Sequence, residues 1–79
     1  MHYVYILKST KFPSHYYTGI TEDLDKRLEA HNRGECPHTK KYKPWRIKTA
    51  ILYTDKEKAH AFEKYLKTPS GRAFAKKRL

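Results

Sequence analysis

Two short stretches near the start of the chain have the residue pattern of paired β-strands. Residues 3–8 (Tyr-Val-Tyr-Ile-Leu-Lys) and 15–20 (His-Tyr-Tyr-Thr-Gly-Ile) are rich in β-branched and aromatic side chains, which favours extended structure. The segment between them is rich in turn-forming residues, so we expect a hairpin. A turn symmetric about Lys11 places Tyr5 opposite Tyr17, and opposed residues on antiparallel strands share a face.

The next segment has the period of an amphipathic helix. Thr21 is a suitable N-cap for a helix over residues 22–33, whose first turn is acidic, and Gly34 is a natural end. The inward-facing positions at helical spacing are Leu24, Leu28 and His31. Arg27 precedes His31 by four residues, so both side chains lie on one face of the helix.

A third strand and two further helices are predicted in the second half of the chain. Residues 45–53 alternate between two faces, with Trp45 on the face of the other odd-numbered positions. Residues 54–57 (Thr-Asp-Lys-Glu) fit a capping box that opens a helix through about Lys67, and the Thr-Pro pair at 68–69 opens a last one. The buried stripe of the first of these helices consists of Ala59, Phe62 and Leu66. The order ββαβαα predicts an α+β fold, a three-stranded sheet with antiparallel pairing flanked by helices.

Composition limits the class of protein. The 79 residues are enough for a single domain, 1–79. The lone cysteine, Cys36, excludes an internal disulfide framework. No apolar run approaches the roughly 20 residues that span a membrane, and the first residues lack a signal-peptide pattern. We therefore expect a small, soluble, cytoplasmic domain without a membrane or disulfide-linked partner.

Basic residues outnumber acidic ones by 18 to 8, giving a formal charge of +10, and they are clustered. Two basic runs, residues 38–48 and 64–79, contain no acidic residue, whereas most acidic residues lie in residues 22–35. Such clusters favour nucleic acid, because neutralised phosphates release counterions. A membrane surface fits less well, since neither cluster has a continuous apolar face opposite it. The expected nucleic-acid contacts are Lys40, Lys41, Lys43, Arg46, Lys67, Arg72, Lys76 and Lys77.

Three polar residues lie where the pattern favours a buried or half-buried position. Arg27 can clamp a phosphate and His31 can transfer a proton near neutral pH, although an arginine packed over a half-buried histidine is also an ordinary surface arrangement. Glu63 lies beside a buried stripe and is the only acid in residues 58–79. It either pairs with Lys67 at i+4 or holds one divalent cation, for which Mg²⁺ is suited because it keeps most of its waters.

Together these residues resemble the GIY-YIG nuclease domain. The triplet Tyr-Val-Tyr at 3–5 is followed by Tyr-Thr-Gly at 17–19, then by Arg27 and His31 on one helix and Glu63 on a later one. The resemblance covers essentially the whole chain. The run Tyr-Thr-Gly-Ile-Thr-Glu-Asp-Leu and the run that begins at Glu63 are most similar to small stand-alone bacterial members, the UPF0213-like proteins.

The resemblance implies a three-stranded antiparallel sheet flanked by helices and an endonuclease that hydrolyses DNA phosphodiester bonds with a divalent metal ion. It implies that Tyr5 and Tyr17 line the site and that Arg27 neutralises the scissile phosphate. Glu63 would hold one Mg²⁺ or Mn²⁺ ion, and His31 would assist proton transfer. Which side chain takes the proton stays open. DNA, including branched or single-stranded forms, is the implied partner, and repair or processing the implied setting.

One position departs from the family pattern. Larger members have an Asn in the helix after the metal-binding glutamate, where this chain offers Lys67, Thr68 and Ser70. Trp45 is either a core residue or a surface on which bases stack. Two other functions therefore stay open: a nucleic-acid-binding module of the same fold without turnover, and a domain whose basic surface binds an acidic protein.

Overall fold

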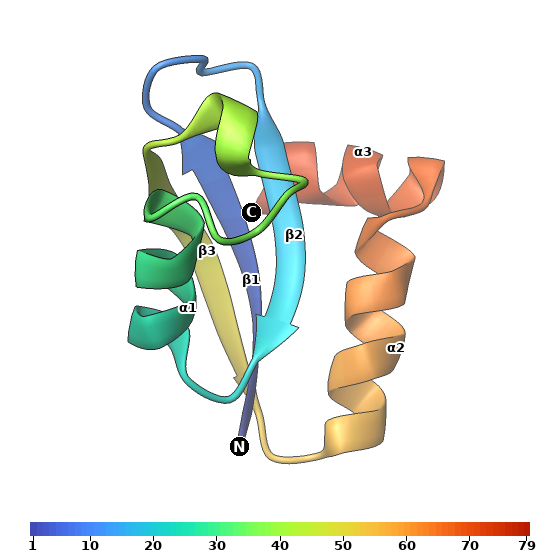
Figure 1. Cartoon of the computed structure of the whole chain (residues 1–79). Helices are drawn as coiled ribbons and strands as arrows, with labels where there is room; N and C mark the ends of the chain where they lie inside the picture. Colours follow the sequence, from blue (N-terminus) through green and yellow to red (C-terminus); the bar gives the residue numbers. More distant parts are fainter.

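The computed structural model describes residues 1–79 and has an α+β fold built on one three-stranded sheet (Figure 1). In chain order its elements are β1 (His2–Ser9), β2 (Tyr16–Thr21), α1 (Leu24–Asn32), the short 3₁₀ helix η1 (Lys40–Tyr42), β3 (Trp45–Tyr53), α2 (Lys56–Leu66) and α3 (Pro69–Arg78). Strand β1 lies between β2 and β3 and is antiparallel to both. The predicted fold class and element order are confirmed. None of the three α-helices has the length and apolar character needed to cross a bilayer.

The two faces of the sheet carry separate apolar clusters, because alternate residues of β1 point to opposite sides. The first cluster lies beneath α2 and α3 and consists of Val4, Ile6, Ala59 and Leu66. The second lies beneath α1 and consists of Tyr5, Leu7 and Trp45. In Figure 1, α1 lies on one side of the sheet and the α2–α3 pair on the other. Strands β2 and β3 are the two edges of the sheet.

The hairpin register differs from the prediction by two positions. Tyr5 pairs with Gly19 rather than with Tyr17, so the turn is centred on Phe12, one residue later than expected. Ser9 sets this turn, because its Oγ accepts a hydrogen bond from the Phe12 amide at 2.9 Å and so fixes the loop locally. Tyr5 and Tyr17 still share a face, with their ring centroids 6.4 Å apart.

A bulge in β3 also corrects the predicted pattern. The pairing with β1 skips Lys48, the residue between Ile47 and Thr49. An extra residue of this kind reverses the alternation of the side chains that follow it. Trp45 therefore packs on the α1 side of the sheet and Tyr53 on the α2 side. The prediction that the odd-numbered residues of this strand share one face is wrong for that reason.

Two helices begin at an aspartate rather than at the predicted threonine. Asp23 caps α1 by accepting a hydrogen bond from the Lys26 amide at 3.1 Å, and Thr21 instead bonds to the Asp23 backbone. Helix α1 therefore begins two residues later than predicted. Asp55, and not Thr54, caps α2. In both cases a carboxylate is available beside the threonine, and it also complements the positive end of the helix dipole.

The other predicted helix boundaries are confirmed. Gly34 follows α1 with φ of 78°, a left-handed conformation that glycine adopts without strain. Thr68 caps α3 through a hydrogen bond from the Gly71 amide, and Pro69 is the first residue of that helix.

Candidate active site

Tyr5 lies at the centre of a group of polar residues on the α1 side of the sheet. It is 1% exposed, and its ring lies over Gly19, which has no side chain to occupy that space. The Tyr5 hydroxyl accepts a hydrogen bond from Arg27 Nε at 3.3 Å and lies 3.0 Å from His31 Nε2. Helix α1 brings both partners to the same hydroxyl, because they are one turn apart. The three residues form one hydrogen-bonded group.

Thr39 extends this group beyond His31. His31 is fully buried, and its Nδ1 lies 2.7 Å from Thr39 Oγ1, which donates to the carbonyl oxygen of Cys36. Arginine can only donate, so the Tyr5 hydroxyl accepts from Arg27 and directs its own hydrogen to His31 Nε2. Neutral His31 then carries its hydrogen on Nδ1 and donates it to Thr39. This assignment pairs the buried polar hydrogens, in agreement with the absence of any unpaired buried side-chain polar atom.

Sequence reasoning missed Thr39. The residue lies in the irregular segment before η1, where no periodicity marks a buried position, and its contact with His31 arises from tertiary packing. Trp45 helps to hold this segment, because its Nε1 donates to the Thr39 carbonyl oxygen at 2.9 Å. Trp45 is itself buried. Its interpretation as a core residue is therefore confirmed, and the alternative of an exposed stacking surface is wrong.

Burial changes the proton affinities of the two central residues in opposite directions. Desolvation, helped by the nearby Arg27 charge, lowers the pKa of His31. Desolvation raises the pKa of Tyr5 above its usual value, against the opposing effect of Arg27. At neutral pH, His31 is therefore an uncharged acceptor and Tyr5 a protonated donor, which is the protonation that their hydrogen bond requires.

This arrangement predicts a pH-dependent stability. The unfolded chain binds a proton on His31 near pH 6.5, whereas the folded chain binds it only at lower pH. The unfolded state thus gains protons first, and the free energy of unfolding falls as the pH decreases below about 6.5. We expect a loss of about 1.4 kcal/mol for each pH unit between the two pKa values, measured by urea denaturation from pH 8 to pH 5. His31→Gln should remove the part of this fall in the free energy of unfolding that comes from His31. If the pH profile of this variant equals that of the wild type, His31 is not the buried neutral histidine that causes the fall.

Tyr17 connects the buried group to the edge of the sheet. Its ring centroid lies 5.0 Å from that of His31, and the ammonium group of Lys67 lies 5.9 Å from the centre of the Tyr17 ring. Lys67 in turn forms an ion pair with Glu63 at 2.5 Å. Tyr17, Arg27 and His31 therefore all lie around Tyr5, and Glu63 of α2 is linked to this group through Lys67 rather than directly.

Glu63 is the residue that the sequence predicts to hold a divalent cation. Its side chain is only 16% exposed, and its carboxylate already has a positively charged partner, the Lys67 ammonium group. No three His, Cys, Asp or Glu residues come close enough together to form a metal cluster. An ion held here would have one protein carboxylate and otherwise water or substrate oxygens, a set that suits Mg²⁺ better than zinc. The i, i+4 ion pair that the spacing predicted is also present.

Where larger family members have an Asn, this chain has Lys67, Thr68 and Ser70, and the first two are engaged in other contacts. Lys67 is the C-cap of α2 and pairs with Glu63. The Thr68 hydroxyl donates to the Tyr65 carbonyl oxygen and accepts from the α3 backbone. Ser70 is exposed in the first turn of α3. Of these three residues, Lys67 is the one whose side chain lies against the Tyr17 ring.

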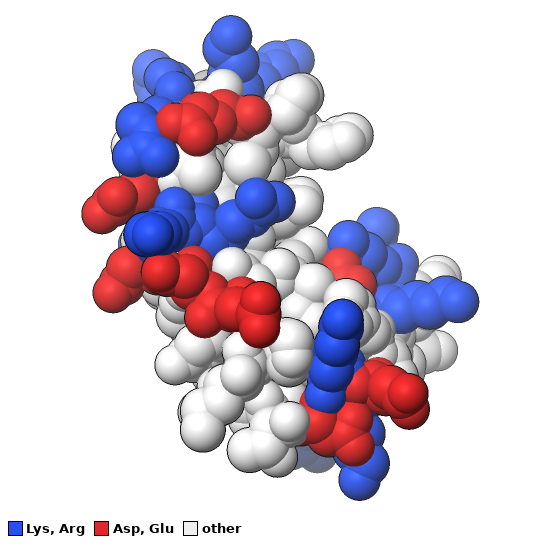
Figure 2. All heavy atoms as spheres, turned by 60° about the horizontal axis from the view of Figure 1, so that its bottom comes forward, with Lys and Arg blue, Asp and Glu red and all other residues white.

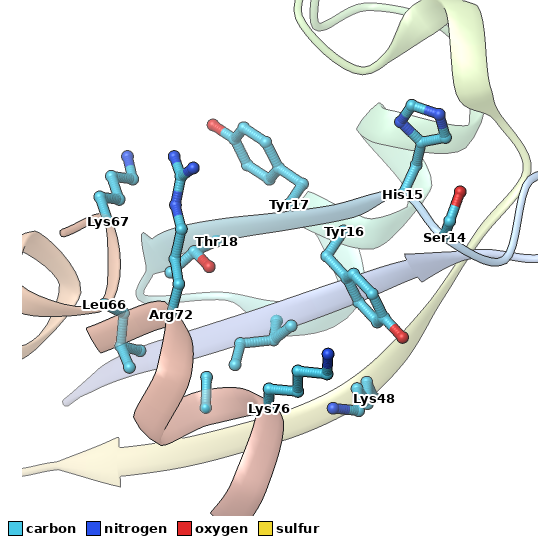
Figure 3. Close-up of a pocket in the computed structure, with 12 residues that line it drawn as sticks. Ser14, His15, Tyr16, Tyr17, Thr18, Lys48, Leu66, Lys67, Arg72 and Lys76 are labelled. Atoms are coloured by element: carbon cyan, nitrogen blue, oxygen red, sulfur yellow. The ribbon is translucent and has the colours of Figure 1, made fainter. Parts of the chain in front are cut away.

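The predicted nucleic-acid contacts lie in two regions. Lys40, Lys41, Lys43 and Arg46 lie on η1 and the start of β3, whereas Lys67, Arg72, Lys76 and Lys77 lie on the end of α2 and on α3. Figure 2 shows the end of the molecule at which α1 and α2 begin, and acidic side chains lie there beside basic ones. The region around α3 differs, because Lys67, Arg72 and Lys76 line a hollow that contains no acidic residue (Figure 3).

Comparison with known proteins agrees with the family resemblance of the sequence. The profile of the GIY-YIG catalytic domain matches residues 1–78. A UPF0213 protein of Clostridium perfringens is 37% identical over 68 residues, which covers 85% of this chain and 71% of the relative. A UPF0213 protein of Halalkalibacterium halodurans is 35% identical over 90% of this chain and 74% of its own length. One from Staphylococcus aureus is 35% identical over 85% and 80%, respectively. No solved structure gives a significant match.

Proposed function

Because the chain belongs to the GIY-YIG family of nucleases, we propose that it is a metal-dependent endonuclease that hydrolyses phosphodiester bonds in DNA, in repair or processing. The observation that carries this proposal is the hydrogen-bonded group of Arg27, Tyr5 and His31 beside Tyr17. In this group an exposed guanidinium is held by the hydroxyl of a buried tyrosine, which leaves it oriented to meet a phosphate.

Arg27 is the residue that would contact the scissile phosphate. Its Nε is engaged by Tyr5, whereas its side chain is otherwise exposed. The two terminal nitrogens are thus free to form a bidentate contact with phosphate oxygens. Tyr5 and His31 hold the guanidinium in place from below, so their role toward the phosphate is positioning. Charge that develops on the phosphate during hydrolysis would be stabilised by a donor that is already oriented.

Proton transfer is restricted by burial. His31 is fully buried, and its two ring nitrogens are bonded to the hydroxyls of Tyr5 and Thr39, so His31 does not contact a substrate proton directly. Tyr17 is less buried, and in Figure 3 its hydroxyl points away from β2, toward the side where the Lys67 and Arg72 head groups lie. Tyr17 is therefore the tyrosine that we assign to direct contact with the substrate or its attacking water.

Glu63 would hold the Mg²⁺ or Mn²⁺ ion, with Lys67 moving from the carboxylate when the ion binds. Such an ion neutralises phosphate charge and lowers the pKa of a bound water, which makes hydroxide available near neutral pH. Lys67 would remain close to the substrate, since it is also beside the Tyr17 ring.

The test is cleavage by the purified protein of branched, nicked and single-stranded DNA with Mg²⁺, Mn²⁺, Ca²⁺ or EDTA. We expect cleavage of at least one substrate with Mg²⁺ or Mn²⁺, and background levels in EDTA, because the charge that develops on the phosphate is then no longer stabilised by a divalent cation. Gel analysis of end-labelled DNA measures both. Equal cleavage with and without EDTA would contradict the metal requirement, and no cleavage of any substrate would contradict the enzymatic function.

A second function is favoured by the ion pair between Glu63 and Lys67. If this pair does not open, the carboxylate is not available to a metal, and the domain would bind nucleic acid without cleaving it. Binding would then depend on salt concentration but not on EDTA, and no metal ion would be retained at Glu63.

A further inference from the structure

A hollow of about 860 Å³ lies on the α2–α3 side of the sheet, between β2 and α3 (Figure 3). Its floor is apolar and consists of Ile6, Leu66 and Ala75. Tyr16 and Tyr17 form the side contributed by β2. Its volume lies in the range of ligand-binding clefts, and it is open to solvent on one side.

Four cationic residues surround this hollow, and no acidic residue lines it. They are Lys48, Lys67, Arg72 and Lys76, from β3, the end of α2 and α3. Lys48 lies 5.2 Å from the centre of the Tyr16 ring, which keeps its ammonium group at the rim. The positive charges of these four residues repel one another. Together they create a positive potential in the hollow, which favours binding of an anion with several charges.

The hollow is continuous with the candidate active site through two residues. Tyr17 lines the hollow and also lies beside His31. Lys67 lines the hollow and pairs with Glu63. A chain of phosphates that passed through the hollow would therefore lead directly to the place where cleavage is proposed.

We propose that this hollow binds the phosphodiester backbone of the substrate strand next to the bond that is cut, with Arg72 and Lys76 as the phosphate-binding residues. This inference rests on the proposed function, because that function defines where the strand leads, namely to the bond that is cut. The occupant is a short stretch of one polynucleotide strand, because the cations lie around a hollow of limited volume with an apolar floor that the sugars and bases can cover. The other group of predicted contacts, Lys40, Lys41, Lys43 and Arg46, lines no such hollow and would contribute only long-range attraction.

The test compares two double variants that remove the same charge. Arg72→Gln/Lys76→Gln changes the hollow, and Lys26→Gln/Lys58→Gln changes two exposed lysines that do not line it. Binding to a fluorescent oligonucleotide is measured by anisotropy in EDTA, so that cleavage does not interfere. We expect the hollow variant to lose at least 10-fold in affinity and the control less than 3-fold. The slope of log K against log salt should decrease by about 1.4 to 1.8 for the hollow variant, as two lost phosphate contacts require.

Failure of this inference can be distinguished from failure of the proposed function. If the wild-type protein does not cleave DNA but the two double variants differ in binding as stated, the hollow is a nucleic-acid site and only the enzymatic function is overturned. If the wild-type protein cleaves and the variants bind equally, the hollow inference is overturned. Equal competition by polyglutamate and DNA would also overturn it, in favour of an acidic protein partner. Lys76→Glu, a single exposed change, provides the same comparison if the double variant does not fold.

Discussion

Glu63→Gln is expected to lower the rate of DNA cleavage by about 100-fold or more at saturating Mg²⁺ and DNA. Glutamine keeps the size of the side chain but removes the charge that would hold the cation, and an ion that stabilises transition-state charge contributes several kcal/mol. A 100-fold change corresponds to about 2.7 kcal/mol. The same variant should bind DNA in EDTA at least as tightly as the wild type, because a negative charge has been removed and Lys67 has been released.

The matched control is Glu57→Gln, an exposed glutamate in the first turn of the same helix. It should retain cleavage within about twofold and lose only the small stabilisation that an acid gives to a helix N-terminus. Binding of Mn²⁺, followed by its electron paramagnetic resonance signal, should weaken in Glu63→Gln alone. If Glu63→Gln cleaves as fast as Glu57→Gln, the carboxylate does not hold a required metal ion.

The existence and order of the elements were predictable because each depends on local pattern. Residues 3–8 and 45–53 alternate or are β-rich, and the stripe of Ala59, Phe62 and Leu66 has helical period. The antiparallel hairpin was predicted correctly, but the register of the strands was not predictable. The two-position shift of the hairpin accompanies hydrogen bonds within the turn, among them those of Ser9 with Phe12 and His15, which the residue pattern does not reveal. The bulge at Lys48 leaves no trace in the alternation of apolar and polar residues, because it only becomes visible against the partner strand.

The candidate site shows the same limit. The spacing of Arg27 and His31 on one helix predicted that they share a face, and both reach Tyr5. The spacing of Glu63 and Lys67 predicted their ion pair. Thr39 was missed, because a hydroxyl residue in an irregular segment becomes a partner of His31 only when that segment folds over α1. The hollow between β2 and α3 was also not predictable, since its lining combines residues of all three strands and of helices α2 and α3.

Gly19→Ala is expected to lower both stability and cleavage. A methyl group at this position would lie 2.6 Å from Cζ of Tyr5, well inside van der Waals contact. The Tyr5 ring cannot rotate away freely, because it is buried and its hydroxyl is bonded to Arg27 and His31. Overpacking of this kind costs about 1 to 3 kcal/mol, and displacement of the hydroxyl would release Arg27 from its position toward the phosphate. Urea denaturation and single-turnover cleavage measure the two effects.

A double-mutant cycle with Tyr5→Leu identifies the cause. If the clash with the Tyr5 ring is responsible, Gly19→Ala should cost much less stability in the Tyr5→Leu background than in the wild type, and the difference is the interaction energy of the two positions. An equal cost in both backgrounds would instead show that the methyl group disturbs the β2 backbone itself. The requirement for glycine in the Tyr-Thr-Gly triplet would then not arise from the tyrosine of the first strand, and the close approach of Tyr5 to β2 would have no part in holding Arg27.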